Sequence, residues 1–457
     1  MNIIIAGCGK VGGTILKRLV GEGHNVTALD QKADVVSSIT DIHDVMGIVG
    51  NAADCETLEK AGVSSTDLFV AVTESDDTNM LSCFLAKKMG AGHTIARIRT
   101  PEYNDDSLSF MRQQLELSMS VNPERLAAEE LYNILMMPAA VKVDHFSRRT
   151  FEMVEIQLKE ESVLDGMTLS EMRNQYKANV LICVVSRGAE TFIPDGSFAL
   201  KSGDRIGVCA THAELQKYLK SLRLMKKQSR SVMILGGSRI AYYLTKMLTA
   251  SGADVKIIEK DREHCEALCE MLPEAVIING EGSHQEVLLE EGLDSMDAFV
   301  SLTGVDEQNI LISMFASTRG VPKVITKISR TEMESMAGKL GLDTIVVPRK
   351  IVSDVVVRYA RARQNSLGSH IETLYNVMGG QAEALEFRVG PDFPGSGIPL
   401  RELKPKPGIL VAGIVHNRKP IIPSGDSFIS EGDMVVVIAR HRKSGEPTLQ
   451  DLSDILG

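Results

Sequence analysis

Short apolar runs alternate with helix-like stretches along the first part of the chain. The runs fall at residues 3–6, 26–29, 46–49, 68–72, 94–98 and 117–121. Between them, apolar residues recur at helical spacing, as in residues 79–89. Short apolar strands that alternate with helices are typical of a parallel, doubly wound sheet with helices on both faces. We therefore predict an α/β fold.

The same pattern occurs a second time. Gly236 lies 229 residues after Gly7, and Glu259 lies 229 residues after Asp30. One residue is then inserted, and identical residues follow at a spacing of 230. The segment 67–81, DLFVAVTESDDTNML, thus returns at 297–311 as DAFVSLTGVDEQNIL. The chain is an internal duplication.

Each copy continues into a stretch of different character. Residues 151–224 and 384–450 are rich in β-branched residues and turns, and Gly203-Asp204 and Gly432-Asp433 each precede an apolar strand. Helices beginning at Pro123 and Pro348 lead into these stretches. We expect two Rossmann-like domains, each followed by a small α+β domain, with bounds at 1–137, 138–225, 229–363 and 370–457. The polar segment MKKQSR, residues 225–230, marks the central boundary.

A glycine-rich loop follows the first strand directly. Gly7-x-Gly9-x-x-Gly12 opens a helix, and the second strand ends on Asp30. This is the dinucleotide fingerprint, in which the glycines allow a tight turn, approach of a pyrophosphate and close helix packing. Phosphates are expected at the helix N-terminus, and Asp30 is placed to accept hydrogen bonds from ribose. The alternative is a loop that uses glycine only for packing.

Composition narrows the class of protein. The chain of 457 residues is 44% hydrophobic, contains no Trp and carries a net charge of −10, with no basic stripe for nucleic acid. No apolar stretch approaches the roughly 18–20 residues that span a bilayer, and the N-terminus enters a strand without a signal peptide. The seven cysteines are scattered and odd in number, as expected of reduced thiols. A cytoplasmic protein is expected.

An NAD-dependent oxidoreductase is the main alternative, because it uses the same fingerprint. Tyr242 and Lys246 have the spacing of a dehydrogenase dyad, but they lie in the first helix after the second glycine loop, too early for that role. Four histidines fall at loops or helix ends, where surface positions are expected (His24, His43, His93 and His145). We expect no catalytic residues.

An acidic cluster follows the fourth strand. Glu74, Asp76 and Asp77 are favoured by the dipole at the start of the next helix, and a solvated helix N-terminus is the expected state. A divalent-cation site is the alternative interpretation. Asn79 is expected to cap or orient this loop. We predict no metal site.

The chain resembles the TrkA-type regulatory subunits of bacterial potassium-uptake systems. The resemblance rests on GCGKVG, Asp30, VAVTESDDTNM, ARIR at 96–99 and the duplication. The repeating unit of that family is called RCK or KTN, and residues 67–79 carry its most specific motif. The resemblance implies a regulatory subunit, not an enzyme, in which bound NAD(H) or, alternatively at the same site, ATP/ADP gates K⁺ flux allosterically. It also implies a homo-dimer or tetramer ring, cytoplasmic and peripheral at the inner face of the cell membrane, with a membrane potassium transporter subunit of the TrkH/TrkG type as partner.

The resemblance implies nucleotide-binding positions in five parts of the first copy. They are the glycine loop, the acidic residue that would bind ribose, an adenine edge, the end of the fourth strand, and two arginines. The arginines would reach phosphates of this subunit's ligand or of a neighbouring subunit's ligand. The positions are Gly7, Cys8, Gly9, Lys10, Val11, Gly12, Asp30, Asn51, Ala52, Thr73, Glu74, Arg97 and Arg99. Asn51 departs from the family, which often has an acid or histidine there.

The matching positions of the second copy are Gly236, Gly237, Ser238, Arg239, Ile240, Glu259, Gly280, Glu281, Thr303 and Lys327. This copy departs from the fingerprint, because Ser238 replaces the second glycine and Ala241 the third. A side chain at 238 can crowd a pyrophosphate, so the sequence leaves open whether the second site binds nucleotide.

Overall fold

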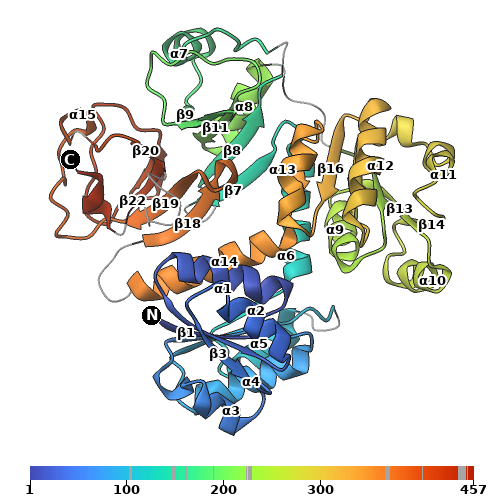
Figure 1. Cartoon of the computed structure of the whole chain (residues 1–457). Helices are drawn as coiled ribbons and strands as arrows, with labels where there is room; N and C mark the ends of the chain where they lie inside the picture. The colour runs from blue at the N-terminus through green and yellow to red at the C-terminus, as the bar shows by residue number, and fades with distance from the viewer. Residues whose placement is uncertain are drawn as a thin grey trace. The chain divides into compact units, whose positions relative to one another are not determined.

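A six-stranded parallel sheet in the order β3-β2-β1-β4-β5-β6 forms the core of the first Rossmann copy (Figure 1). Its strands are β1 (Asn2–Ala6), β2 (Asn25–Asp30), β3 (Met46–Val49), β4 (Leu68–Ala71), β5 (His93–Arg97) and β6 (Met119–Val121). Its helices are α1 (Lys10–Gly21), α2 (Ala33–Thr40), α3 (Cys55–Lys60), α4 (Asp76–Lys88), α5 (Asp105–Gln114) and α6 (Pro123–Met136). The strand order reverses between β1 and β4, where open α/β sheets bind ligands.

The computed structural model describes residues 1–101, 105–146, 150–159, 162–188, 190–222, 224, 229–365, 371–403, 405–440, 449 and 451–456. The chain forms two bodies, residues 1–127 with 347–364, and residues 128–346 with 365–457. The helix α6 therefore begins in the first body and continues into the second.

The first sheet forms because its strands are apolar on both faces. Residues 3–6 of β1 are all buried, as expected of a central parallel strand. The buried positions of α1 are Gly12, Ile15, Leu16 and Leu19, which form one stripe at helical spacing. Prediction from periodicity was correct for every strand of this sheet, with ends that differ by up to two residues. The helix predicted at 79–89 begins earlier, at Asp76, because Ser75 caps it by accepting a hydrogen bond from Thr78.

The first body also contains a helix from the second copy, α14 (Pro348–Asn365). Its residues Val352, Val356, Val357 and Ala360 share a buried cluster with Ile15, Leu16 and Leu19 of α1. Figure 1 shows α14 alongside α1. The guanidinium of Arg361 donates two hydrogen bonds to Glu22, at 2.7 and 2.8 Å. A helix distant in sequence thus covers one face of the first sheet.

The surface interpretation is wrong for His24, which is buried, and His93 and His145 are only half-exposed and each has a polar partner. His24 is only 6% exposed. Nδ1 of His93 lies 3.2 Å from the hydroxyl of Tyr359 on α14. His145, in the second body, lies 3.6 Å from Glu152.

The second Rossmann copy repeats the first, with a parallel sheet in the order β14-β13-β12-β15-β16-β17. Its strands are β12 (Ser231–Leu235), β13 (Asp254–Glu259), β14 (Val276–Asn279), β15 (Ala298–Ser301), β16 (Lys323–Lys327) and β17 (Ile345–Val346). Its helices are α9 (Arg239–Ala250), α10 (Arg262–Met271), α11 (Gln285–Glu290), α12 (Asp306–Thr318) and α13 (Thr331–Lys339).

Each small domain has a five-stranded antiparallel sheet. The first contains β7 (Lys142–Phe146), β8 (Phe151–Gln157), α7 (Leu169–Tyr176), β9 (Leu181–Arg187), β10 (Glu190–Phe192), β11 (Arg205–Ala210) and α8 (His212–Ser221). The second contains β18 (Ile371–Val377), β19 (Ala382–Arg388), α15 (Leu400–Leu403), β20 (Ile409–His416), β21 (Lys419–Ile421) and β22 (Met434–Arg440). Short 3₁₀ helices lie at Val63–Ser65, Leu293–Ser295, Met378–Gly380 and Leu452–Ile455.

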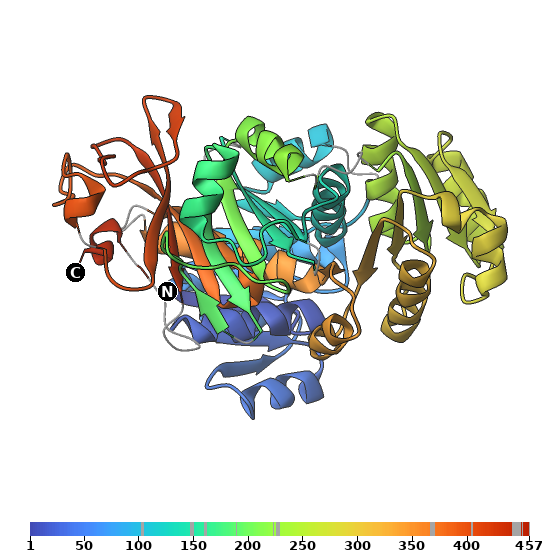
Figure 2. The ribbon, with the colours of Figure 1, turned by 90° about the horizontal axis from the view of Figure 1, so that it is seen from above.

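The two small domains pack against each other through a shared apolar cluster. Phe151, Met153 and Val184 of the first domain lie in it with Ala384, Val436 and Ile438 of the second. Figure 2 shows the two sheets, green and orange-red, side by side. Lys142 donates to the carbonyl of Asn376 at 2.7 Å, and Glu155 accepts from the amide of Met378 at 3.0 Å.

The prediction of two Rossmann-like domains, each followed by a small α+β domain, is confirmed. The bounds at 137, 138, 229 and 363 stay predictions. Three further bounds lie outside the described residues, at 225, 370 and 457. Most of the boundary segment 225–230 also lies outside them.

Candidate functional site

The glycine loop of the first copy leaves the start of α1 open. Gly7 has a φ of +88°, and a Cβ there would lie 2.6 Å from the amide nitrogen of Thr73. A Cβ on Gly12 would lie 1.9 Å from the carbonyl oxygen of Gly7, so the helix approaches the strand as closely as glycine allows. Gly9 is the N-cap residue of α1 and provides no side-chain hydrogen bond to the first amides of the helix. A Cβ on Gly9 would have open space around it. Amides at an uncapped helix start are donors suited to an anion.

Asp30 closes this loop from the end of β2. Its Oδ2 accepts a hydrogen bond from the amide of Cys8 at 2.7 Å, and its Oδ1 accepts one from the amide of Lys32 at 3.0 Å. The carboxylate therefore lies against the glycine loop. This is the position at which the dinucleotide fingerprint has the acidic residue that binds ribose.

Three of the assigned loop residues turn their side chains into the protein. Burial, together with Asp30, raises the pKa of the Cys8 thiol to about 12, so it stays protonated. Val11 packs against the core, and Ile240 is 6% exposed. Only the backbone of these residues is available to a ligand, whereas Lys10 and Arg239 are exposed.

The two residues expected at an adenine edge follow the end of β3. Asn51 is exposed, and its Oδ1 accepts from the amide of Ala53 at 3.0 Å. Ala52 beside it is buried. The amide of Gly50 donates to the carbonyl of Asp30 at 2.9 Å, which brings this edge beside the ribose acid.

Asn79 orients the end of β4, as predicted. Its Oδ1 accepts from the amide and the hydroxyl of Thr73, at 2.8 and 2.7 Å. Its Nδ2 donates to the carbonyls of Thr73 and Arg97, at 3.2 and 3.0 Å. The buried guanidinium of Arg97 donates to the same Thr73 carbonyl. One amide side chain thus fixes the ends of two neighbouring strands.

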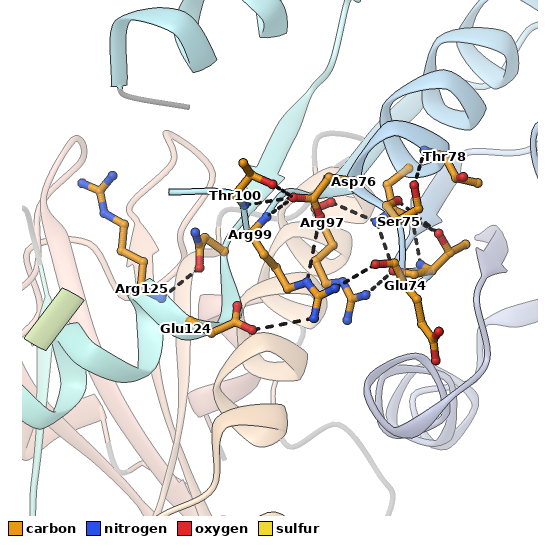
Figure 3. A network of polar contacts seen from close by, with 12 residues as sticks. Glu74, Ser75, Asp76, Thr78, Arg97, Arg99, Thr100, Glu124 and Arg125 are labelled. Atoms are coloured by element: carbon orange, nitrogen blue, oxygen red, sulfur yellow. Dashed lines mark hydrogen bonds and ion pairs between the residues drawn. The ribbon is translucent and has the colours of Figure 1, made fainter. Parts of the chain in front are cut away.

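Asp76 differs from the expected solvated residue. Its Oδ2 accepts from the amides of Arg99 and Thr100, at 2.8 and 2.9 Å, and from the Thr100 hydroxyl at 2.7 Å (Figure 3). The carboxylate of Asp76 therefore fixes the segment that follows β5 through these hydrogen bonds. Among the described residues no group of three or more acidic, His or Cys side chains could hold a metal ion.

Arg99 extends from that segment over the end of β4. Its Nη2 donates to the carbonyl of Glu74 at 2.7 Å, and its Nη1 lies 3.9 Å from Oε1 of Glu124 on α6 (Figure 3). The structure brings Arg97, Arg99, Thr73 and Glu74 together at one edge of the sheet. Glu124 was missed from the sequence, because the second copy carries Arg349 at the matching position.

The second copy keeps most of this framework. The amide of Gly237 donates to Glu259 at 2.7 Å, and Asn309 accepts from Thr303 as Asn79 does from Thr73. Lys327 donates to the carbonyl of Thr303 at 2.8 Å. Gly280 precedes Glu281, whose Oε1 accepts from Ser283 and from Gln308.

The helix start of the second copy is closed. The hydroxyl of Ser238 accepts a hydrogen bond from the amide of Ala241 at 3.4 Å and caps α9. The tyrosine and lysine that resembled a dehydrogenase dyad contact each other along this helix, where Lys246 donates to the hydroxyl of Tyr242 at 3.1 Å. The two glycine loops therefore differ in the hydroxyl of Ser238, which caps the helix, and in Ala241, which stands where Gly12 allows the closest approach in the first copy.

Comparison with known proteins places the chain in a family. Residues 3–113 and 232–348 match the TrkA-N domain, and residues 153–223 and 384–443 match the TrkA-C domain. The Trk system potassium uptake protein TrkA of Haemophilus influenzae is 29% identical over 451 residues, 97% of each chain. A TrkA homolog of Archaeoglobus fulgidus is 30% identical over 440 residues, 96% of this chain and 97% of that one. The chain belongs to the TrkA family.

Solved structures share the fold of this TrkA homologue. The GsuK RCK domain matches with a TM-score of 0.64 at 15% identity, over 96% of this chain and 92% of that one. A GsuK channel bound to NAD has a TM-score of 0.64 at 14% identity, over 96% and 76%. GsuK bound to ADP has a TM-score of 0.50 at 11% identity, over 78% and 68%. In the described part of the chain, no helix is long and apolar enough to cross a membrane.

Proposed function

We propose that this TrkA homologue is a nucleotide-sensing regulatory subunit of a potassium transporter, and not an enzyme. Nucleotide bound in the first Rossmann copy changes the conformation of the chain and so gates K⁺ flux. A ligand shifts such an equilibrium only by its difference in affinity for the two states. The protein acts in the cytoplasm, at the inner face of the membrane, on a transporter subunit of the TrkH/TrkG type.

The open helix start of the first copy carries this proposal. Gly9 leaves the amides at the start of α1 uncapped beside Asp30, in the crevice where the strand order reverses. In the second copy Ser238 already satisfies the amide of Ala241. The first copy is therefore the sensing site, and binding by the second copy is weaker.

The ligand is NAD(H), with ATP or ADP as alternative occupants of the same site. Support comes from the GsuK structures, one with NAD and one with ADP. The glycine loop suits the phosphates that these ligands share, and Asp30 suits the adenosine ribose. Arg97 and Arg99 place two guanidinium groups near the same edge, and guanidinium matches phosphate geometry.

An exposed apolar groove supports assembly into a homo-oligomer. The groove of about 370 Å³ between α4 and α5 is lined by Met80, Leu81, Phe84, Phe110 and Met111, among others. Leu81 is 49% exposed, and its counterpart Leu311 on α12 is 65% exposed. Because both repeats present an exposed leucine at the same position, a second copy of the chain is the proposed occupant, in a dimer or a tetramer ring.

Titration calorimetry on the purified full chain tests the sensing site. Asp30→Ala is expected to weaken the binding of both NADH and ATP, since both ligands carry the adenosine ribose that Asp30 is proposed to hold. Unchanged affinities for both ligands contradict that assignment. Absence of NADH and ATP binding by the wild-type chain contradicts the proposed function.

Steady oxidation of NADH with a carbonyl substrate favours an oxidoreductase instead. Nucleotide-dependent K⁺ flux with the co-purified transporter then tests regulation.

A further inference from the structure

His93 connects the first Rossmann sheet to helix α14. It is the first residue of β5, and its Nδ1 lies 3.2 Å from the hydroxyl of Tyr359 on α14 and 3.4 Å from the hydroxyl of Ser118 before β6. The rings of His93 and Tyr359 meet edge to face, with centroids 5.9 Å apart. When Nε2 carries the proton of the neutral ring, Nδ1 accepts a hydrogen bond from Tyr359. In the protonated ring both nitrogens are donors, so this acceptor is lost.

The matching position of the second copy carries a lysine. Lys323 follows His93 by 230 residues and is the first residue of β16. Its Nζ donates to the hydroxyl of Thr344 before β17 at 2.9 Å, and to the carbonyl of Ala140, which follows α6, at 2.6 Å. Each copy thus uses this position to bind a segment that belongs to the other copy in sequence. Only the first copy does so with a side chain whose ordinary pKa lies near neutral pH.

Positive charge gathers around His93. Lys87 on α4, Asp67 before β4, and Tyr359 and Arg363 on α14 face it. Nζ of Lys87 donates to the carbonyl of the residue before His93 at 2.7 Å, and the guanidinium of Arg363 lies 5.1 Å from the centroid of the Tyr359 ring. Burial, Arg363 and Lys87 lower the pKa of His93 from its usual value, and Asp67 opposes them.

We propose that His93 is a pH-sensitive switch that holds α14 on the first Rossmann copy when neutral and weakens this attachment when protonated. A proton adds a positive charge beside Arg363 and Lys87, and it removes the acceptor of the Tyr359 hydroxyl. Free histidine takes up a proton near pH 6.5, whereas attached His93 takes it up at lower pH. The detached state therefore binds more protons, and the attachment is complete above about pH 7.5 and weakens toward pH 5.5.

The switch acts on a helix that connects the two copies. In the chain, α14 follows the second Rossmann copy and precedes the second small domain, but it packs in the body of the first copy. Val352 and Val356 of α14 share a buried cluster with Leu16 and Leu19 of α1. An attachment that depends on pH therefore makes the packing of α1 and the coupling between the copies depend on pH.

Amide hydrogen exchange on the full chain, without nucleotide, tests the switch. Protection of α14 amides is expected to fall between pH 7.5 and pH 5.5 in the wild type. In His93→Gln, whose amide stays neutral, the fall is expected to be smaller by a factor of about 3–10, since pH 5.5 is about one unit below the pKa of free histidine. His43→Gln, at a half-exposed histidine of the same body, is the control and is expected to fall as the wild type does.

His93→Lys tests the same inference from the opposite direction. It places a cation beside Arg363 and Lys87, so protection of α14 at pH 7.5 is expected to drop about 3- to 10-fold, to near the wild-type level at pH 5.5. Wild-type protection in His93→Lys at pH 7.5 overturns the inference. So does a fall in His93→Gln as large as that of the wild type.

The His24→Gln background separates His93 from the other buried histidine of this body. The difference that His93→Gln makes is expected to be the same there, because the two sites titrate independently. A difference that disappears in this background overturns the inference, since His24 is then the group that titrates. None of these outcomes bears on the proposed nucleotide site, because the measurement uses no nucleotide.

Discussion

Gly9 and Ser238 occupy the same place in the two copies and have similar extended backbone conformations. Their φ and ψ angles are −65° and −158° in the first copy, and −62° and 165° in the second. The difference between an open and a capped helix start is therefore one side chain on a common backbone. The sequence shows the replacement, but only the structure shows that the hydroxyl faces the helix amides.

Gly9→Ser is expected to transfer the capped state to the first copy. A Cβ fits there without contact, and Ser caps a helix slightly better than Gly, so folding is kept. The hydroxyl competes with phosphate for the same amides, and the Kd for NADH and ATP is expected to rise at least about 10-fold. Titration calorimetry measures the change. Gly21→Ser, at the open far end of α1, is the matched control, and equal affinities in both variants contradict the role of the open cap.

His24 makes the stability of the first body depend on pH. Burial, the N-terminal amino group and Arg361 lower its pKa to about 4. An unfolded chain protonates histidine near pH 6.5, so below that pH the unfolded state binds more protons than the folded one. Stability contributed by His24 is therefore complete above about pH 7 and is lost as the pH falls toward 4, by roughly 2–3 kcal/mol in total.

Hydrogen exchange of amides in α1 and α14, measured between about pH 7 and pH 5, detects this loss. His24→Gln is expected to flatten the pH dependence of protection. His43→Gln changes a half-exposed histidine in the same body and is expected to leave the slope unchanged. An unchanged slope in His24→Gln means that another group titrates.

Helix α14 marks the limit of what periodicity can predict. Pro348 and the apolar residues Val352, Val356 and Ala360 predict a helix and its buried face. An apolar stripe fits many apolar surfaces, however, so the sequence does not specify that this face packs on α1 of the other copy. By contrast, the local roles of Asn79 and Asn309 were predictable, since the duplication repeats them with Thr73 and Thr303. Contacts without a repeated counterpart, such as Arg99 with Glu124, leave no such signal.

Arg361→Gln tests the attachment of α14. The side chains of Arg361 and Glu22 are only 12% and 14% exposed, so removing the cation leaves a largely buried carboxylate unpaired. We expect a loss of about 2 kcal/mol from the opening free energy of α1 and α14, below the full range for buried pairs because some solvent reaches this one. Hydrogen exchange measures it. Arg262→Gln removes an exposed pair with Glu266 and is expected to cost less than about 0.5 kcal/mol.

Duplication allows one copy to keep a function while the other keeps mainly the framework. Asp30 and Glu259, Thr73 and Thr303, and Asp76 and Asp306 make matching contacts. The differences gather at the glycine loop and at the Arg99 position, which is where a nucleotide is expected. The small domains differ in a similar way, since Arg187 pairs with buried Asp204 but His416 pairs with buried Asp433. One chain thus combines two similar scaffolds with unequal chemistry.

The exposed groove on α4 and α5 gives a test of assembly that is independent of nucleotide binding. Leu81 and Phe110 are 49% and 63% exposed, and a stable interface would bury both. The double variant Leu81→Glu, Phe110→Glu places charge there, and unpaired charges are costly to bury. We expect a smaller species in sedimentation velocity, with NADH affinity unchanged. Val276→Glu, at a 54% exposed position on the edge strand β14, is the control. If the double variant sediments as the wild type does, the groove is not the contact between copies, and a different surface must close the oligomer.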